Sequence, residues 1–288
     1  MPQHATVAEL RRAISTEVLV AAGLPRTSPL QTLLRPLVWP PAHRFARLAA
    51  EFDRRAAESG LTAAVASMEH RFVDEVIAIG AEHIPAVGPL VVASNHPGSY
   101  DSLLIASVLA RDDLKVIVSD VPFLRSMVAS SCYMIYTTGD AQVRMAVTRE
   151  SIRHLESGGA LLVFATGKVD PDPAVLPGGL ESLQNWSPSL PLFLRRVPEA
   201  ALLVTIVSGV LAPSCFRHPL TRLRKGQRQR QFLAEFIQIS QQVLFGRRFP
   251  LTPEVRFGIP LRAADLGGGR DPEAARAAIV AQAEGLLD

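Results

Sequence analysis

A histidine and an aspartate five positions apart are the residues of this chain best suited to acid–base chemistry. His96 and Asp101 lie in the segment Asn95-His96-Pro97-Gly98-Ser99-Tyr100-Asp101. A histidine can take a proton from an attacking hydroxyl, and a nearby carboxylate can hold the imidazole tautomer and stabilise the imidazolium. Pro97 and Gly98 could turn the chain so that the two side chains meet. A plain turn is the alternative, because this spacing also occurs by chance.

The segment connects an apolar stretch typical of a buried strand to an apolar helix. The strand covers residues 90–94, and the helix begins near residue 101. From Phe72 onward, short apolar runs alternate with helical stretches, which predicts an α/β fold with a mostly parallel central sheet flanked by helices. Ligand sites of such sheets lie at the carboxyl ends of strands, where His96 falls.

The alternation of apolar runs gives a set of expected elements. We predict strands near residues 73–79, 89–94, 114–119, 133–137, 160–165, 201–208 and 254–258. Helices are expected near residues 101–111, 122–130, 141–157, 228–245 and 271–287. Asp271 and Pro272 support the start of the last helix as N-cap and first-turn residues.

Residues 1–71 are predicted to form a helical extension of an α/β domain that covers residues 72–288. Apolar residues recur at spacings of three and four in this extension, as at Val7, Leu10, Ile14 and Val18. Several prolines in residues 29–41 are expected to break the helical pattern. This segment is more apolar than a solvated linker, so we expect it to dock on the core or on lipid.

Composition favours one sizeable domain and excludes several other classes. The chain has 288 residues, of which 48% are hydrophobic. Its two cysteines exclude a disulfide framework and favour a reducing, cytoplasmic-facing location. No apolar run reaches the roughly 18 residues of a spanning helix, and the N-terminus does not resemble a secretory signal. Asp170 and Asp172, each followed by proline, indicate a rigid turn rather than a metal site.

The segment around His96 resembles the signature of the lysophospholipid and glycerol-phosphate acyltransferase superfamily, in which Asn-His, four residues and Asp stand between a strand and a helix. Asn95, His96 and Asp101 match this signature. Similar flanking stretches, 79–85 and 255–261, extend the resemblance over about residues 73–288. The resemblance implies that His96 is the general base, that Asp101 orients it and that Asn95 belongs to the substrate site. It assigns no acyl-enzyme nucleophile.

Two further blocks of the family, which usually hold the acceptor's phosphate, are incomplete here. The second normally ends in Phe-Ile-Asp-Arg, but residues 134–138 lack the arginine. The third normally reads Phe-Pro-Glu-Gly-Thr-Arg, but residues 164–169 read Phe-Ala-Thr-Gly-Lys-Val. We therefore expect a weakened phosphate clamp and an acceptor other than lysophosphatidate alone. The candidate acceptor-site residues are Thr166, Gly167, Lys168 and Arg144. A solvated loop lysine is the alternative for Lys168.

Seven basic residues with no acidic residue between them form a second notable feature. This basic cluster consists of Arg217, His218, Arg222, Arg224, Lys225, Arg228 and Arg230. Such a cluster is typical of contact with an anionic membrane surface, where each cation contributes about 1 kcal/mol. It also suits acyl carrier protein or the phosphates of coenzyme A. Nucleic acid is disfavoured because aromatic residues only flank the cluster, and a solvated loop is the plain alternative.

With the resemblance, these features predict an O-acyltransferase held peripherally at the cytoplasmic face of a membrane. It would move a fatty acyl group from acyl-CoA or acyl carrier protein to a hydroxyl of a lysophospholipid or other glycerolipid-like acceptor. No cofactor beyond the thioester co-substrate and no metal is predicted. Backbone amides of residues 97–99 or of the Gly167 loop are expected to stabilise the oxyanion. The alternative, favoured by the incomplete blocks, is a catalytically silent relative that binds lipid or tethers a partner to membranes.

Overall fold

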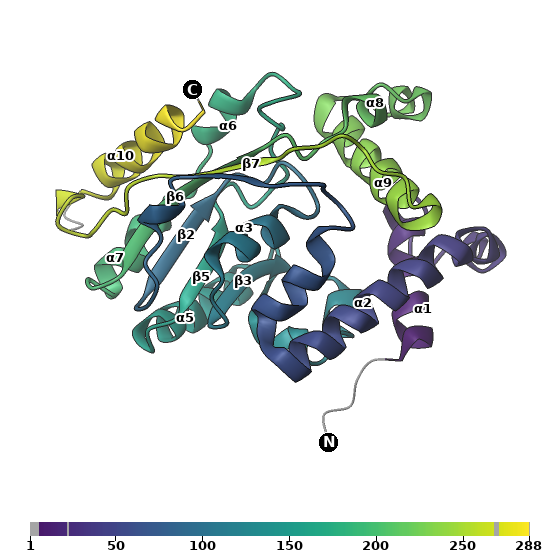
Figure 1. Cartoon of the computed structure of the whole chain (residues 1–288), viewed down its shortest axis with the longest axis horizontal. Coiled ribbons are helices and arrows are strands. Elements are labelled where there is room, and N and C mark those ends of the chain that lie inside the picture. The colour runs from purple at the N-terminus through teal and green to yellow at the C-terminus, as the bar shows by residue number, and fades with distance from the viewer. Residues whose placement is uncertain (1–5, 22, 268–270, 288) are drawn as a thin grey trace.

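A computed structural model describes residues 6–21, 23–267 and 271–287, and its centre is a seven-stranded sheet between helical layers (Figure 1). The strand order is β1-β7-β6-β2-β5-β3-β4. Neighbouring strands run parallel except β6 and β7, which are antiparallel. The predicted α/β fold, with a mostly parallel sheet flanked by helices, is confirmed.

The sheet is apolar on both faces because helices cover both. The strands are β1 (Ile77–Ile79), β2 (Leu90–Ser94), β3 (Leu114–Ser119), β4 (Met134–Thr137), β5 (Ala160–Phe164), β6 (Ala201–Ser208) and β7 (Glu254–Phe257). In β2, Leu90 and Val92 join one hydrophobic core, whereas Val91 and Ala93 join the other. Successive side chains of a strand point to opposite faces, so a strand covered on both sides must be apolar throughout.

The helices divide between the two cores. They are α1 (Val7–Ala21), α2 (Leu30–Glu69), α3 (Asp101–Leu109), α4 (Pro122–Arg125), α5 (Ala141–Glu156), α6 (Gly179–Leu183), α7 (Leu190–Arg196), α8 (Pro213–Phe216), α9 (Gln227–Phe245) and α10 (Pro272–Gly285). The first core contains residues of α2 and α3, and the second contains residues of α5, α7 and α10. The helix expected at residues 122–130 is only the short α4, and α6, α7 and α8 were not predicted, because one or two turns show no clear periodicity.

The expectation that prolines break the helix at residues 29–41 is wrong. Helix α2 runs through this segment with Pro36, Pro40 and Pro41 inside it, and its non-helical residue is Gly60, with φ 85°. Each proline removes one hydrogen bond to the carbonyl four residues earlier. Those carbonyls belong to Thr32, Pro36 and Leu37, which are exposed, so water can replace the lost donors.

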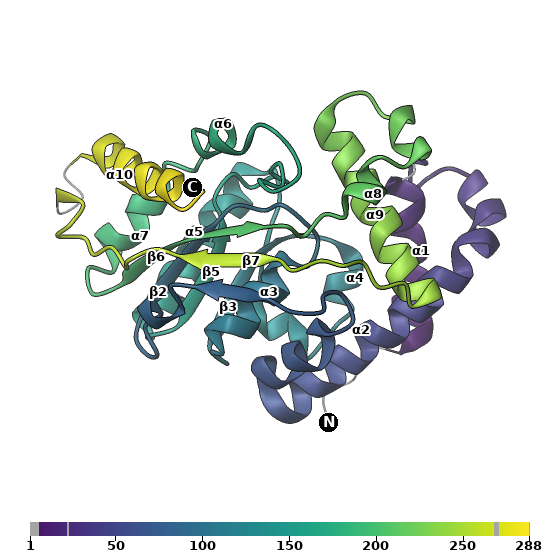
Figure 2. The same ribbon diagram turned by 45° about the horizontal axis from the view of Figure 1, so that its top comes forward.

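Helix α9 lies beyond the carboxyl ends of the strands, beside α1 and α2 (Figures 1 and 2). Its inner face therefore meets the loops that follow β2, β5 and β6. Within the described ranges, no helix combines the length and apolar character needed to cross a bilayer. The boundary between an extension of residues 1–71 and a domain of residues 72–288 stays a prediction.

Candidate active site

Loops that follow the three central strands β2, β5 and β6 are tied together at one edge of the sheet. The backbone N–H of His96 donates to Asp170 Oδ2 at 2.9 Å, and the backbone N–H of Asp170 donates to the carbonyl of His96 at 2.8 Å. Asp172 accepts from the backbone N–H groups of Gly209 and Leu211 at 2.8 Å each. Both aspartates of the Asp-Pro-Asp-Pro segment thus fix loop backbone, as a rigid turn would require.

His96 and Asp101 meet at this edge. Nδ1 of His96 lies 2.8 Å from Asp101 Oδ2, and the Asp101 side chain is 1% exposed while that of His96 is 26% exposed. An ionised carboxylate only accepts hydrogen bonds, so Nδ1 carries the proton and Nε2 is the basic nitrogen. Asp101 is the first residue of α3, where the helix dipole favours a negative charge.

The surroundings of His96 favour its charged form. The ring stacks on Phe164, with centroids 4.1 Å apart and planes at 22°. Burial lowers the pKa of His96, but the charge and hydrogen bond of Asp101 oppose this, and the nearby Glu235 and Asp170 add to the rise. The pKa of His96 therefore lies above its ordinary value. A raised pKa makes the neutral imidazole a stronger base and favours the imidazolium that forms when it accepts a proton.

Asn95 has a different place from the one expected. Its side chain is 2% exposed, Nδ2 donates to the carbonyl of Val207, and Oδ1 accepts from the Val207 backbone N–H, both at 2.8 Å. Both polar atoms of the Asn95 amide are therefore bonded to the backbone of β6. An amide suits this position because it offers a donor and an acceptor together. The role of Asn95 in the substrate site stays a prediction.

The loop after β5 brings Thr166, Gly167 and Lys168 to the same edge as His96. The Thr166 hydroxyl donates to Asp170 Oδ2 at 3.0 Å and accepts from the Lys168 backbone N–H at 3.2 Å, so it serves the loop. Gly167 turns the chain with φ +62°, and its N–H donates to the Phe164 carbonyl. Lys168 is exposed.

The amides expected to form the oxyanion hole are mostly engaged elsewhere. The N–H of Gly98 donates to Asp101 Oδ2 at 3.2 Å, and those of Gly167 and Lys168 have the loop partners given above. Pro97 has no N–H. Ser99 is exposed, and in the described part of the chain its backbone N–H has no acceptor.

Arg144 is not brought to the His96–Asp101 pair. It lies in the first turn of α5 after the edge strand β4, and its guanidinium donates to the carbonyl of Gly139. Three strand spacings separate β4 from β2, which is about 14 Å. Its expected role in the acceptor site finds no support in this placement.

Known proteins similar to this chain include one protein family and one solved structure. The family model described as Acyltransferase matches residues 75–185. The match covers the segment that carries the His96–Asp101 pair. A crystal structure of the 1-acyl-sn-glycerophosphate (LPA) acyltransferase PlsC from Thermotoga maritima is similar with a TM-score of 0.43 and 16% identity, over 85% of this chain and 80% of that one. No curated protein sequence matches this chain significantly.

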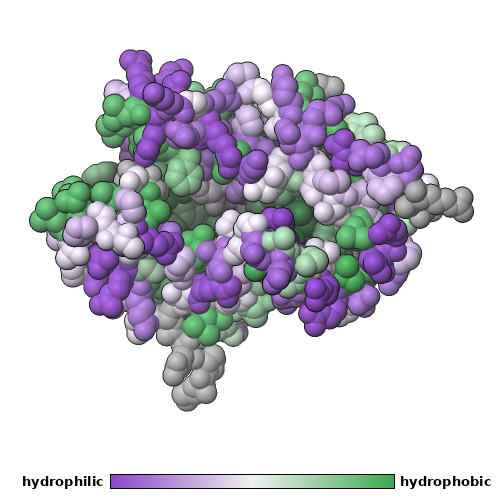
Figure 3. Space-filling view, turned by 180° about the vertical axis from the view of Figure 1, so that it is seen from behind, coloured by the Kyte–Doolittle hydropathy of each residue, from purple (hydrophilic) through white to green (hydrophobic). Residues whose placement is uncertain are grey.

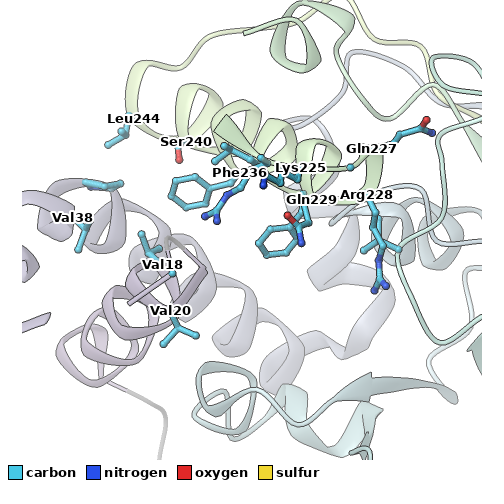
Figure 4. A pocket seen from close by; sticks show the side chains of 17 residues that line it. Val18, Val20, Val38, Lys225, Gln227, Arg228, Gln229, Phe236, Ser240 and Leu244 are labelled. Carbon is cyan, nitrogen blue, oxygen red and sulfur yellow. The ribbon is translucent and has the colours of Figure 1, made fainter. Parts of the chain in front are cut away.

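A groove of about 1060 Å³ lies between α1 and α2 on one side and α9 on the other. Apolar side chains from both sides line most of it, and Figure 4 shows Val18 and Val38 across from Phe236 and Leu244. Residues of the basic cluster, Arg224, Lys225 and Arg228, line it near the start of α9, and Figure 4 places Arg228 at the end away from Leu244. The groove is therefore apolar along its length and cationic at one end.

The groove comes close to the His96–Asp101 pair. Val169 lines it, and the next residue, Asp170, is bonded to the His96 backbone in both directions. Sequence reasoning did not find this groove, because its two walls are about 200 residues apart along the chain. It also missed Glu235 of α9, which accepts a hydrogen bond from the Ser99 hydroxyl at 2.8 Å.

Proposed function

We propose that this protein is a glycerolipid-type O-acyltransferase that moves a fatty acyl group from a thioester to a lipid-like hydroxyl. The observation that carries the proposal is the buried Asp101 carboxylate 2.8 Å from Nδ1 of His96 within the segment that the family model matches. This contact leaves Nε2 as the base, at the edge of a parallel sheet where ligands bind.

In the proposed reaction, Nε2 of His96 accepts the proton of the acceptor hydroxyl as its oxygen attacks the thioester carbonyl. The tetrahedral intermediate collapses to the ester and expels the thiolate, which takes the proton from the imidazolium. Asp101 stabilises the imidazolium between these steps. The backbone N–H of Ser99 is the proposed donor to the oxyanion, because it lies three residues after His96 and has no acceptor among the described residues.

The groove supports a lipid-like substrate. An acyl chain gains about 0.8 kcal/mol for each CH₂ group that it removes from water, which favours the apolar walls. An anionic head group or the phosphates of a donor would suit the cationic end at Lys225 and Arg228. This division into apolar and basic parts supports the proposed substrate class.

The direct test offers labelled acyl-CoA and acyl carrier protein thioesters to the purified protein with an extracted lipid mixture. We expect an acylated lipid, identified by mass spectrometry, with at least one donor. If the folded protein bound lipid but formed no product with either donor, it would be a silent lipid-binding relative instead.

The acceptor should not depend strongly on a phosphomonoester. The chain lacks both arginines of the family's phosphate clamp, and the exposed Lys168 offers one point charge in their place. When lysophosphatidate and monoacylglycerol compete, we expect a preference of no more than about tenfold for the phosphate, because an exposed ion pair contributes at most about 1 kcal/mol. Product ratios from mass spectrometry measure it. A strong preference that disappears in Lys168→Ala, but not in the control Lys115→Ala, would contradict this prediction.

We also propose that the lips of the groove contact an anionic membrane surface. On one lip, Leu30, Leu33 and Leu37 form an exposed stripe on α2, with exposures of 51%, 73% and 79%. On the other, Leu220 and Leu223 are exposed beside the basic cluster. Figure 3 shows hydrophobic side chains at the two corresponding parts of one edge, with a hollow between them and hydrophilic residues around them.

Charge reversal in the basic cluster should release the protein from anionic vesicles. The variant combines Arg222→Glu, Lys225→Glu and Arg228→Glu, all at exposed positions. Loss of three cations should weaken binding by about 3 kcal/mol at low salt, and binding of the wild type should fall as salt shortens the Debye length. Vesicle sedimentation measures both effects. The matched control reverses three exposed arginines elsewhere, Arg149, Arg153 and Arg196. If both variants were released equally, or neither were released, the basic cluster would not be the surface that contacts the membrane.

A further inference from the structure

A buried carboxylate of α9 lies against the loop that carries the His96–Asp101 pair, and the mechanism above does not use it. Glu235 is 6% exposed, and its Oε2 accepts from the Ser99 hydroxyl at 2.8 Å. Its Oε1 is buried and has no hydrogen-bond partner among the described residues. A buried acceptor without a partner destabilises the fold by about 1–3 kcal/mol. The carboxyl group at this position therefore lowers the stability of the fold.

Glu235 is the middle member of a polar face that braces this loop. Gln231 lies four positions before it and Gln238 three positions after it, which places all three on one side of α9. Nε2 of Gln231 donates to the Pro97 carbonyl at 2.8 Å. Nε2 of Gln238 donates to the Tyr100 hydroxyl at 2.9 Å. Helix α9 thus contacts the loop at Ser99 and at residues before and after it in the chain.

The same position makes Glu235 part of the charge distribution around His96. Burial raises the pKa of Glu235 to about 7, although the Ser99 hydroxyl and the charge of His96 oppose the rise. The other titratable groups that face this region are Asp101 and Tyr100 on the β2–α3 segment, and Asp170 and Asp172 after β5. Asp101 raises the pKa of both Glu235 and His96 when it is ionised, and Asp170 raises that of His96.

We propose that Glu235 is a positioning residue of the acyltransferase site, which holds the loop through the Ser99 hydroxyl and sets the basicity of His96 through its own charge. The inference rests on the proposed function for its consequence in catalysis, but not for the electrostatic coupling itself. An ionised Glu235 stabilises the imidazolium together with Asp101, and a protonated Glu235 does so less. The two groups therefore titrate as a coupled pair.

Two variants separate the charge of Glu235 from its hydrogen bond. Glu235→Gln removes the negative charge and keeps an oxygen that can accept from Ser99. Ser99→Ala removes the hydroxyl that lowers the pKa of Glu235 and keeps the ionisable carboxyl. We expect the pKa of His96, followed by NMR of the imidazole nitrogens, to fall by roughly 0.5 to 1 unit in Glu235→Gln. It should fall less in Ser99→Ala, which raises the pKa of Glu235 but keeps the carboxyl. It should stay within about 0.2 of a unit in Glu273→Gln, an exposed control on α10.

The pH dependence of kcat/KM gives an independent readout. The acidic limb should move to lower pH by the same amount in Glu235→Gln, because His96 then loses its proton more readily. Ser99→Ala should lower the rate at all pH values and move the limb less than Glu235→Gln does, since the carboxyl remains. A merely structural Glu235 would lower the rate in both variants and move neither limb.

The wild-type protein supplies the test that needs no variant. The imidazole signals of His96 should titrate in two steps, one of them near the pKa of Glu235. A single step, or an unchanged His96 pKa in folded Glu235→Gln, would overturn the proposal. If the coupling is present but no acyl transfer is found, the inference on Glu235 holds and the proposed function fails.

Discussion

Replacement of His96 by alanine should abolish most acyl transfer while the protein stays folded. The expected loss in kcat is two to four orders of magnitude, because the acceptor hydroxyl loses its proton acceptor. The fold should tolerate the change, since the loop is held by the His96 backbone, which bonds Asp170 in both directions and is unaffected by the side chain. Product formation by mass spectrometry and a thermal melt measure the two properties.

The exposed His70, at the end of α2, provides the matched control. His70→Ala should retain wild-type activity and stability. If purified, folded His96→Ala retained rates close to those of the wild type, His96 would not be the general base. The loss of activity would also have to occur with saturating acceptor, because a defect confined to KM would indicate a binding role.

Replacement of Asp101 by asparagine should cost nearly as much activity, for a geometric reason. Three N–H groups converge on this carboxylate: Nδ1 of His96 and the backbone of Gly98 on Oδ2, and the backbone of Ser102 on Oδ1. An amide has one acceptor oxygen and one NH₂ group. In either orientation the NH₂ group faces at least one of these donors, and the charge that stabilises the imidazolium is lost.

We expect kcat of Asp101→Asn to fall by two to four orders of magnitude, with the acyl donor still bound. Asp140→Asn is the control, because Asp140 also accepts backbone N–H groups at the start of a helix, α5, but lies at the edge strand β4. It should affect stability slightly and activity hardly at all. Equal losses of activity in the two variants would show that Asp101 only caps its helix.

The strands were largely predictable from the sequence because their signal is local. A strand covered on both faces is a mostly apolar run, and the predicted bounds of β2, β3, β5 and β6 agree with the structure within one or two residues. The His96–Asp101 contact was also accessible, since five residues with a proline and a glycine form a turn without help from the rest of the chain. The catalytic roles inferred from that contact stay predictions.

Other parts of the site could not be derived in this way. Asn95 reads as a site residue in the sequence, but its amide pairs with Val207, 112 residues further along. Arg144 follows a strand as His96 does, but that strand, β4, lies three strand spacings, about 14 Å, from β2. Linear order does not reveal which strands are neighbours.

The sequence by itself determined the α/β class and the turn that joins a histidine to an aspartate, because both depend on residues close together in the chain. Only the tertiary structure decided which polar groups are buried and what they face. In the sequence, Glu235 cannot be told from a solvated glutamate of an amphipathic helix. In the structure it lies against Ser99, 136 residues away. Its environment, like that of the groove, arises where distant segments pack and exclude water, and such exclusion is a property of the folded chain.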